Sequence, residues 1–77
     1  MELYFYEDCE YSQVVLNAIT NLKIKDKFTF KDIRVNTKYA KELTELTGNK
    51  IVPCLVTADG PMKEAKNIRN YLVSHFM

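Results

Sequence analysis

A run of apolar and aromatic residues near the N-terminus, "LYFY" at residues 3–6, restricts the fold of this chain more than any other feature. An uninterrupted run of this kind is typical of a strand that is buried on both faces, as in α/β proteins. Helices must then cover both faces of the sheet that contains it. A chain of 77 residues can supply that cover for one small sheet, so we expect residues 1–77 to form a single α/β domain.

The residues after this run change to a helical period. Apolar side chains recur at intervals of three or four residues, at Tyr11, Val14, Val15, Ala18, Ile19 and Leu22. This spacing predicts an amphipathic helix of about three turns with one stripe that faces the core.

Two further helices are indicated by the same kind of pattern. Asn36 or Thr37 can cap the start of the first, and Gly48 ends it. Its inward-facing residues are expected to be Ala40, Leu43 and Leu46, with Tyr39 beside them. The last helix runs from about residue 64 to residue 76, and its apolar face consists of Ile68, Leu72 and Phe76, flanked by Tyr71.

Three more strands complete the pattern. The segment "KFTFKDIRV" alternates, with an irregularity near Asp32, and its inward residues are expected to be Phe28, Phe30, Ile33 and Val35. A third strand at residues 52–57 ends at the Asp59-Gly60 turn, and a short fourth strand at residues 61–63 pairs back on it. The predicted order is β-α-β-α-β-β-α, with the first two strands parallel through a right-handed crossover.

The composition excludes several classes of function. Hydrophobic residues make up 47% of the chain, which is enough for a compact core and too much for a disordered segment. The net charge of +1 calls for neither a nucleic acid nor a membrane as a partner. No apolar stretch approaches the length of a membrane span, and the N-terminus lacks the pattern of a secretory signal. We therefore expect a cytoplasmic protein whose two cysteines stay reduced.

Three motifs coincide with this order of elements. Cys-x-x-Ser stands between the first strand and the first helix as "CEYS" at residues 9–12, Val52-Pro53 opens the third strand, and "DGPMKEAKNIRNYL" covers the end of the chain. Together they resemble the thioredoxin fold, and within it the glutaredoxins and the N-terminal domain of glutathione S-transferases. The resemblance implies a four-stranded mixed sheet of order 2-1-3-4 with helices on both faces. It also implies a cis Val52-Pro53 bond, the alternative being a trans proline that opens an edge strand.

The resemblance to glutaredoxins gives Cys9 a role. The glutaredoxin motif is often Cys-Pro-Tyr-Cys, which Cys9 and Tyr11 match and from which Glu10 and Ser12 depart. Because a hydroxyl cannot resolve a mixed disulfide, the implied mechanism is monothiol: Cys9 attacks a glutathione mixed disulfide, and free glutathione regenerates it. Ser12 either donates a hydrogen bond to the Cys9 thiolate or merely occupies the first helical turn. Glutathione is thus the implied co-substrate and glutathionylated protein thiols are the implied partners of a monomer that needs no metal.

Two opposing effects act on the thiolate of Cys9, which is the form that attacks disulfides. A helix N-terminus, with the amides near Tyr11 and Ser12 directed at the sulfur, would stabilise the thiolate. Nearby carboxylates disfavour a second negative charge. These carboxylates belong to Glu7, Asp8 and Glu10. We expect Cys9 to be less acidic than the cysteine of a typical glutaredoxin, and the balance of the two effects stays open at this point.

The resemblance to the transferases implies a glutathione site. Their pattern of Val-Pro, Asp-Gly and Glu-Ser is matched at Val52-Pro53, Asp59-Gly60 and Glu64, with Ala65 in place of the serine. The backbone of Val52 beside Pro53 would pair with glutathione as an added strand. Glu64 would contact the γ-glutamyl amine, the amides of Glu64 and Ala65 would hold the adjacent carboxylate, and Lys50 would reach the glycyl carboxylate. For Glu64 and Lys50, a solvated surface charge is an equal alternative.

Two other candidate residues are expected to lie outside this site. Cys54 follows Pro53, so its side chain should point away from the site or into the core, and a disulfide with Cys9 is not expected. His75 is expected to be a solvated residue at the end of the last helix. The cysteines and the histidine do not have the spacing of a zinc site.

Two other functions compete with a glutaredoxin-like oxidoreductase. The first is a non-catalytic binding module, for glutathione or for protein thiols, that has lost the redox cycle; the acidic surroundings of Cys9 favour it. The second is an iron–sulfur carrier, but such relatives typically have Cys-Gly-Phe-Ser, and Glu10 and Tyr11 argue against it. The transferases carry a second, all-helical domain that would begin where this sequence ends, which favours the glutaredoxin interpretation over a transferase.

Overall fold

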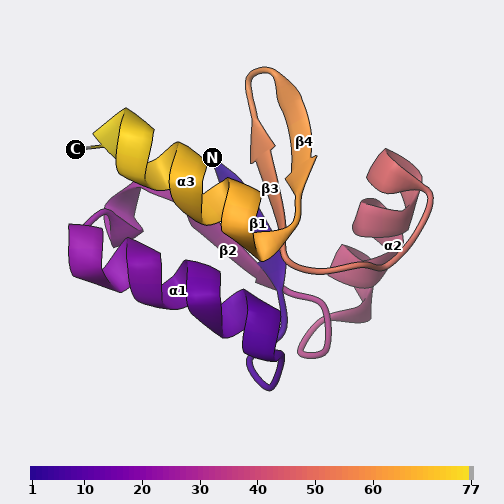
Figure 1. Cartoon of the computed structure of the whole chain (residues 1–77). Helices are drawn as coiled ribbons and strands as arrows, with labels where there is room; N and C mark the ends of the chain where they lie inside the picture. Colours follow the sequence, from indigo (N-terminus) through magenta and orange to yellow (C-terminus); the bar gives the residue numbers. More distant parts are fainter. Residues whose placement is uncertain (77) are drawn as a thin grey trace.

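The apolar run at the N-terminus forms strand β1 (Glu2–Phe5), which lies inside a sheet and is paired on both sides. The computed structural model describes residues 1–76, and its four-stranded sheet has the order β2-β1-β3-β4 (Figure 1). Strand β1 runs parallel to β2 (Thr29–Asp32) and antiparallel to β3 (Cys54–Thr57), and β4 (Gly60–Lys63) pairs antiparallel with β3. This is the predicted strand order of the thioredoxin fold.

Helices cover the two faces of the sheet. Helices α1 (Glu10–Leu22) and α3 (Ala65–Phe76) lie side by side, and α2 (Thr37–Thr47) lies apart from them (Figure 1). A 3-10 turn (Lys25–Lys27) connects α1 to β2. The order of elements agrees with the prediction. Within residues 1–76, no helix is both long and apolar enough to cross a membrane.

The alternation of side chains along β1 divides the core into two parts. Leu3 packs into a buried cluster with residues of α1, α3 and β3, which are Val15, Ile19, Leu55, Ala65, Ile68 and Leu72, together with Ile24. Tyr4 packs on the opposite face, against Leu43 of α2 and Cys54 of β3. Leu3 and Tyr4 are 0% and 2% exposed, so the run is buried on both faces, as its sequence predicts.

The second strand is shorter than predicted. Its alternation suggested a strand that reaches Val35 with an inward side chain, but β2 ends at Asp32 and Val35 is 83% exposed. The Asp32 Oδ1 atom accepts hydrogen bonds from the backbone N–H groups of Arg34 (2.8 Å) and Val35 (3.2 Å). This local turn competes with the sheet ladder and carries the chain away from it.

The core-facing stripes of two helices are narrower than predicted. In α1, Val15 and Ile19 are fully buried, but Tyr11 and Val14 lie at the edge of the stripe and are 67% and 37% exposed. In α2, Leu43 is fully buried and Leu46 is 48% exposed. Apolar residues spaced three and four apart define a stripe on the helix that is wider than the strip of helix surface that a small sheet covers. The residues at the edges of the stripe therefore stay exposed.

Helix α2 begins and ends at the predicted residues. Asn36 caps it, because its side chain accepts a hydrogen bond from the Lys38 N–H at 2.9 Å. Gly48 ends it with a φ of 85°, in the left-handed region that glycine adopts readily.

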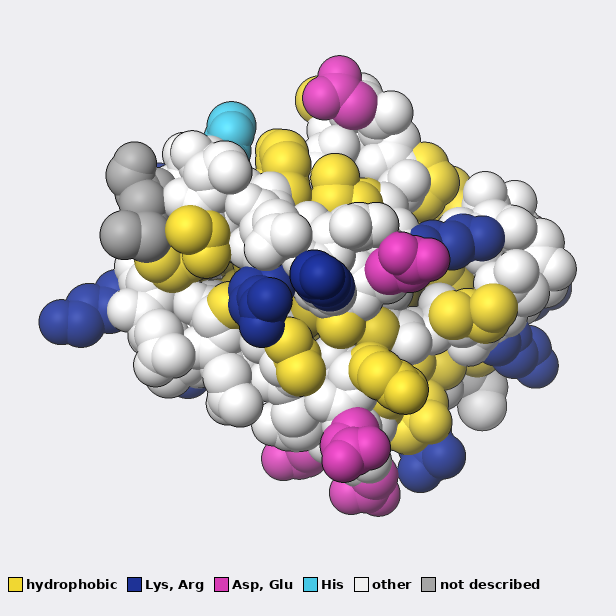
Figure 2. All heavy atoms as spheres, in the orientation of Figure 1, with side chains coloured by type: hydrophobic (Ala, Val, Ile, Leu, Met, Phe, Trp, Pro, Cys, Tyr) yellow, Lys and Arg dark blue, Asp and Glu magenta, His cyan; other side chains and the backbone are white. Residues whose placement is uncertain are grey.

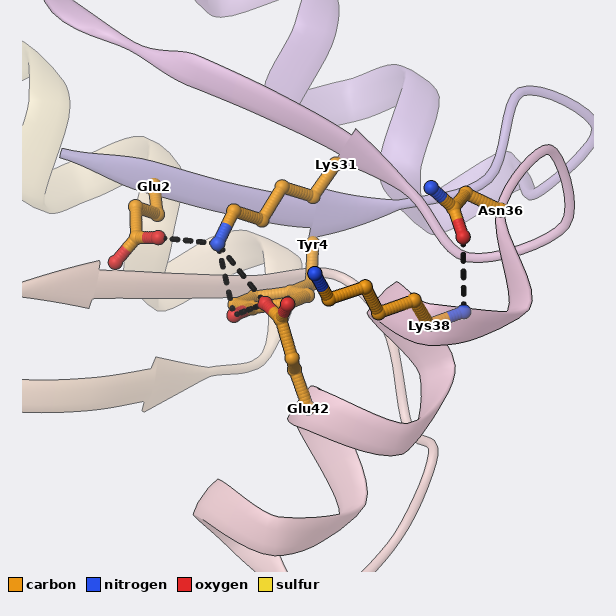
Figure 3. Close-up of polar contacts among 6 residues, drawn as sticks. All are labelled: Glu2, Tyr4, Lys31, Asn36, Lys38 and Glu42. Atoms are coloured by element: carbon orange, nitrogen blue, oxygen red, sulfur yellow. Dashed lines mark hydrogen bonds and ion pairs between the residues drawn. The ribbon is translucent and has the colours of Figure 1, made fainter.

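A polar network joins α2 to the sheet (Figure 3). The ammonium group of Lys31 on β2 lies 2.5 Å from the Glu2 carboxylate and 3.0 Å from the Glu42 carboxylate. The buried Tyr4 hydroxyl donates a hydrogen bond to Glu42 at 3.0 Å, and the Lys31 ammonium also lies over the Tyr4 and Tyr39 rings. This network and Leu43 therefore hold α2 against the sheet.

Hydrogen bonds within this network shift two pKa values in opposite directions. The bond from Lys31, followed by that from Tyr4, holds the pKa of Glu42 below its usual value. The bond to Glu2 is the largest cause that raises the pKa of Lys31, with further support from Glu42. A lowered carboxyl pKa contributes stability above the pKa of the unfolded chain, and that contribution is lost as pH falls through the folded pKa. The contribution of Lys31 is lost only at alkaline pH.

We expect Glu42→Gln to lower the free energy of unfolding at neutral pH. The deficit relative to wild type should begin to shrink as pH falls below about 4–5, where Glu42 takes up a proton in the unfolded wild-type chain, and should vanish once pH is also below the lowered pKa of Glu42 in the folded protein. Urea unfolding of both proteins across this range measures the difference. Glu45→Gln, an exposed position on the same helix, serves as the matched control. A deficit that stays constant from neutral to acidic pH would contradict the role assigned to Glu42.

Candidate functional site

Cys9 stands at the N-terminus of α1. It is the N-cap residue, with extended backbone angles (φ −83°, ψ 120°), and its side chain makes no capping hydrogen bond. Its backbone N–H donates to the carbonyl of Tyr6 at 3.2 Å, and its carbonyl accepts from Gln13 at 3.0 Å. The backbone N–H groups in the first turn of α1 therefore have no capping side chain as a hydrogen-bond partner and can face the sulfur. Cys9 is 8% exposed.

The surroundings of Cys9 lower the pKa of its thiol. Burial alone would raise this pKa, but the backbone N–H and hydroxyl of Ser12, the backbone N–H of Tyr11 and the side chain of Tyr6 together outweigh burial. The carboxylates that were expected to oppose ionisation are not among these causes. They belong to the exposed residues Glu7, Asp8 and Glu10. The sequence left open whether the helix N-terminus or the carboxylates dominate; the lowered pKa of Cys9 means that the net effect favours the thiolate.

Ser12 is completely buried in the first turn of α1. Among the described residues, its Oγ atom has no hydrogen-bond partner of ordinary geometry. The hydroxyl nevertheless lies close enough to Cys9 to lower the pKa of the thiol. The contact between the Ser12 hydroxyl and the Cys9 sulfur is therefore too poorly aligned to count as a hydrogen bond, but it still favours a charged sulfur. A buried hydroxyl without a partner costs about 1–3 kcal/mol, and a thiolate at Cys9 would supply the partner.

A groove of about 490 Å³ lies between the start of α1, the segment before β3 and the start of α3. Five of its lining residues were predicted from the sequence: Tyr11, Val52, Pro53, Glu64 and Ala65. The Val52–Pro53 peptide bond is cis. The face drawn in Figure 2, with α1 and α3 in front, carries hydrophobic side chains between basic and acidic ones. Such a mixture suits a ligand that has both apolar and charged groups.

Glu64 forms the corner between β4 and α3. Its φ of 68° lies in the left-handed region, which is uncommon for a residue other than glycine. Its carbonyl accepts from the Ile68 N–H at 3.0 Å, and its carboxylate accepts from the Asn67 side chain at 3.0 Å. Glu64 therefore starts α3 and holds the first turn of that helix beside the groove.

The structure separates some of the predicted residues from the groove. Cys9 and Ser12 do not line it; they adjoin it through Tyr11, two residues after Cys9. Lys50 is exposed and also does not line it, whereas Lys63 and Lys66 do. The sequence analysis missed these two lysines, although they flank the Glu64-Ala65 pair that it selected.

The other candidates lie where they were expected. Cys54 is completely buried against Tyr4 and Leu43, burial raises the pKa of its thiol, and both cysteines are free. His75 is exposed near the end of α3 and stacks on Tyr71 with ring centroids 5.2 Å apart. Residues 1–76 contain no group of three or more His, Cys, Asp or Glu side chains that could hold a metal ion.

Comparison with known proteins identifies relatives of this domain. A family model described as "Glutathione S-transferase, N-terminal domain" matches residues 3–77. Among solved structures, the chain is similar to an epsilon-class glutathione S-transferase from the housefly, Musca domestica, with 21% sequence identity and a TM-score of 0.79. The match covers 97% of this chain and 34% of the housefly chain, so this chain spans about a third of that protein. No curated protein matches the sequence.

Proposed function

We propose that this chain, which belongs to the family of glutathione S-transferase N-terminal domains, is a glutathione-dependent domain. The activity proposed for it is that of a monothiol, glutaredoxin-like oxidoreductase that acts on glutathione mixed disulfides. The observation that carries this proposal is the lowered pKa of the Cys9 thiol at the N-terminus of α1. A thiol whose pKa is lowered, next to a groove of mixed character, is suited to nucleophilic attack on a disulfide.

The proposed reaction has two exchange steps. The Cys9 thiolate attacks the glutathionyl sulfur of a protein mixed disulfide; a bond forms between Cys9 and glutathione, the original S–S bond breaks, and the protein thiolate leaves and takes a proton from water. A glutathione thiolate then attacks the glutathionyl sulfur on Cys9, which releases oxidised glutathione and the Cys9 thiolate. One mixed disulfide is reduced, and one molecule of free glutathione is oxidised as it joins the glutathionyl group of the substrate in oxidised glutathione. Ser12 supplies a hydrogen bond to the thiolate and no second thiol.

The groove is the proposed glutathione site. Glutathione carries two carboxylates and one amine, and the groove offers two cations and one carboxylate, from Lys63, Lys66 and Glu64. The backbone of Val52 would pair with the tripeptide as an added strand. Ala65 lacks the hydroxyl that the family pattern places there, so a lysine takes over a larger part of carboxylate binding. Lys66 is next to Ala65 and is the candidate for that part.

Turnover of a glutathionylated peptide by free glutathione tests this function. The wild-type protein should catalyse release of the peptide thiol, and Cys9→Ser should lose the catalysis. Ser12→Ala should slow it roughly tenfold, because one hydrogen bond to the thiolate at the weak end of the range for charged groups contributes about 1.5 kcal/mol, and 1.4 kcal/mol is about a factor of ten. Ser74→Ala, at an exposed position of α3, is the matched control and should keep the wild-type rate. A wild-type protein that leaves the uncatalysed rate unchanged would contradict the proposal.

The burial of Cys9 favours a second candidate, a non-catalytic binding module. A sulfur on a residue only 8% exposed must become accessible before it can attack a disulfide. Such a module would bind glutathione in the groove and leave it unchanged. Calorimetric binding of glutathione to wild type and to Cys9→Ser, with equal affinity and no turnover by either, would identify this function.

A further inference from the structure

We propose that the open edge of strand β2 binds an extended peptide of a partner protein, which adds to the sheet as a fifth strand. The peptide carries a bulky apolar side chain between a basic and an acidic residue, each two positions away from it. A groove of about 400 Å³ beside this edge accommodates these side chains. It shares no lining residue with the proposed glutathione groove, so the two sites are separate.

Strand β2 is an end strand of the sheet, on the side opposite β4 (Figure 1). The N–H groups of Thr29 and Ile33 donate to the carbonyls of Met1 and Phe5, each at 2.8 Å, so these residues face β1. Backbone groups of successive residues in a strand point to opposite sides, and the N–H and C=O of Phe30 therefore face away from β1. Within residues 1–76, no strand pairs with β2 on that side. The edge thus offers a donor and an acceptor to a new strand.

The usual protections of an exposed edge are missing at β2. Proteins block such edges with proline or with charged side chains. Strand β4, the other end strand, contains Pro61, whereas β2 contains no proline. The ammonium of Lys31 is held by Glu2 and Glu42, and the Asp32 carboxylate accepts from the turn that follows the strand. Both charges of β2 are therefore engaged within the domain and leave its edge available.

The groove lies between this edge and α1. Its apolar lining comes from Phe30, Leu16 and Ile19. The α1 residues that line it are on the side of the helix away from α3, because residues on the other side line a separate groove with Arg69 and Val73 of α3. A peptide residue directly opposite Phe30 projects its side chain to the same face of the sheet as the Phe30 ring, and so into the groove.

The two ends of the groove carry opposite charges. Glu7, before α1, lines one end, and Lys25, after α1, lines the other. Both are exposed, and within residues 1–76 neither takes part in an ion pair. Arg34 lies 3.8 Å from the centre of the Tyr6 ring and pairs with Asp8 at 3.7 Å, so it does not neutralise Glu7. The groove therefore matches a strand with a cation at one end and a carboxylate at the other.

The direction of the peptide sets the order of its charges. Strand β2 runs from the Lys25 end toward the Glu7 end, because Lys25 precedes β2 and Glu7 follows the parallel strand β1. An antiparallel peptide, the slightly more stable pairing, begins near Glu7 and ends near Lys25. Its basic residue thus comes first and its acidic residue last. These two residues are about 13–14 Å apart on a strand, and the α1 wall between Gln13 and Thr20 is about 10 Å long.

The test is the binding of a fluorescein-labelled peptide, SRTFTES, to the full chain, measured by fluorescence anisotropy. It should bind saturably, SRTATES should bind at least about tenfold more weakly, and the charge-reversed SETFTRS should bind roughly three- to tenfold more weakly. The double variant Glu7→Lys/Lys25→Glu should prefer SETFTRS. Lys41→Glu, at an exposed position of α2, is the control and should keep the wild-type affinity.

Pairing through the backbone is tested by N-methylation of the peptide. A methyl group on the nitrogen of the central Phe, which faces β2, should weaken binding at least about tenfold, and one on the nitrogen of the next Thr, which faces away, should change it by less than about twofold. Equal losses from the two methyl groups, or no binding of SRTFTES to the folded protein, would overturn the proposal. So would a dimer in sedimentation equilibrium that excludes the peptide, because a second copy of this chain would then cover the edge.

Discussion

Iodoacetamide should alkylate Cys9 at least about a hundredfold faster than Cys54 while the protein is folded. Cys54 is completely buried between Tyr4 and Leu43, and burial raises the pKa of its thiol. It can react only when the structure opens, and opening of a core strand costs several kcal/mol, where each 1.4 kcal/mol is about a factor of ten. Cys9 is at the N-terminus of α1, it is 8% exposed where Cys54 is fully buried, and the pKa of its thiol is lowered. Peptide mapping by mass spectrometry after short labelling times gives both rates.

Denaturation provides the control for this comparison. In urea the two thiols should react at similar rates, because their environments become alike. Comparable rates in the folded protein would contradict the burial of Cys54. Slower reaction of Cys9 than of Cys54 would contradict the environment described for the N-terminus of α1.

Leu43→Ala should destabilise the protein by about 2–5 kcal/mol, as is typical of a large-to-small change in a core. Leu43 is the completely buried residue of α2, and it packs against Tyr4 and Cys54. A domain of this size is stable by about 4–12 kcal/mol in total, so the loss is a large fraction. Urea unfolding monitored by circular dichroism measures it. Hydrogen exchange should show the greatest loss of protection in α2.

Leu46→Ala is the matched control for this prediction. Leu46 lies on the same helix three residues later, but it is 48% exposed, so the same substitution should change the stability by less than about 0.5 kcal/mol. Equal losses at the two positions would mean that α2 does not pack on the sheet through Leu43.

The fold could be predicted because the apolar periods are distinct and local. The run at residues 3–6 required cover on both faces, and the structure supplies it, with Leu3 facing one core cluster and Tyr4 the other. Errors arose where a side chain competed with the backbone ladder. The alternation through Val35 is real in the sequence, but the Asp32 carboxylate ends the strand first by binding two backbone N–H groups. Hydrophobic pattern alone does not reveal such a turn.

The candidate site was only partly predictable, for a related reason. Each motif is a short run of neighbouring residues. Three such motifs supplied Tyr11, Val52-Pro53 and Glu64-Ala65, and the fold brings them to one groove. They gave no information about which lysine reaches that groove. Lys50 does not line it and Lys63 and Lys66 do, since that choice depends on the direction of side chains at the hairpin and at the start of α3.

Arg34 shows the same limit more clearly. It is distant from Cys9 in the sequence and belongs to a segment that the alternation assigned to a strand. Its contact with Tyr6 depends on the parallel pairing of β1 with β2 and on the turn at Asp32. Only the combination of topology and a local turn places it against Tyr6.

Intact-protein mass spectrometry after incubation with oxidised glutathione tests the central claim, that Cys9 is a nucleophile toward glutathione disulfides, most directly. Wild type and Cys54→Ser should each gain the mass of one glutathionyl group, and Cys9→Ser should gain none. Free glutathione should then remove the group. Absence of the adduct on a folded wild-type protein, or its persistence in Cys9→Ser, would contradict the claim.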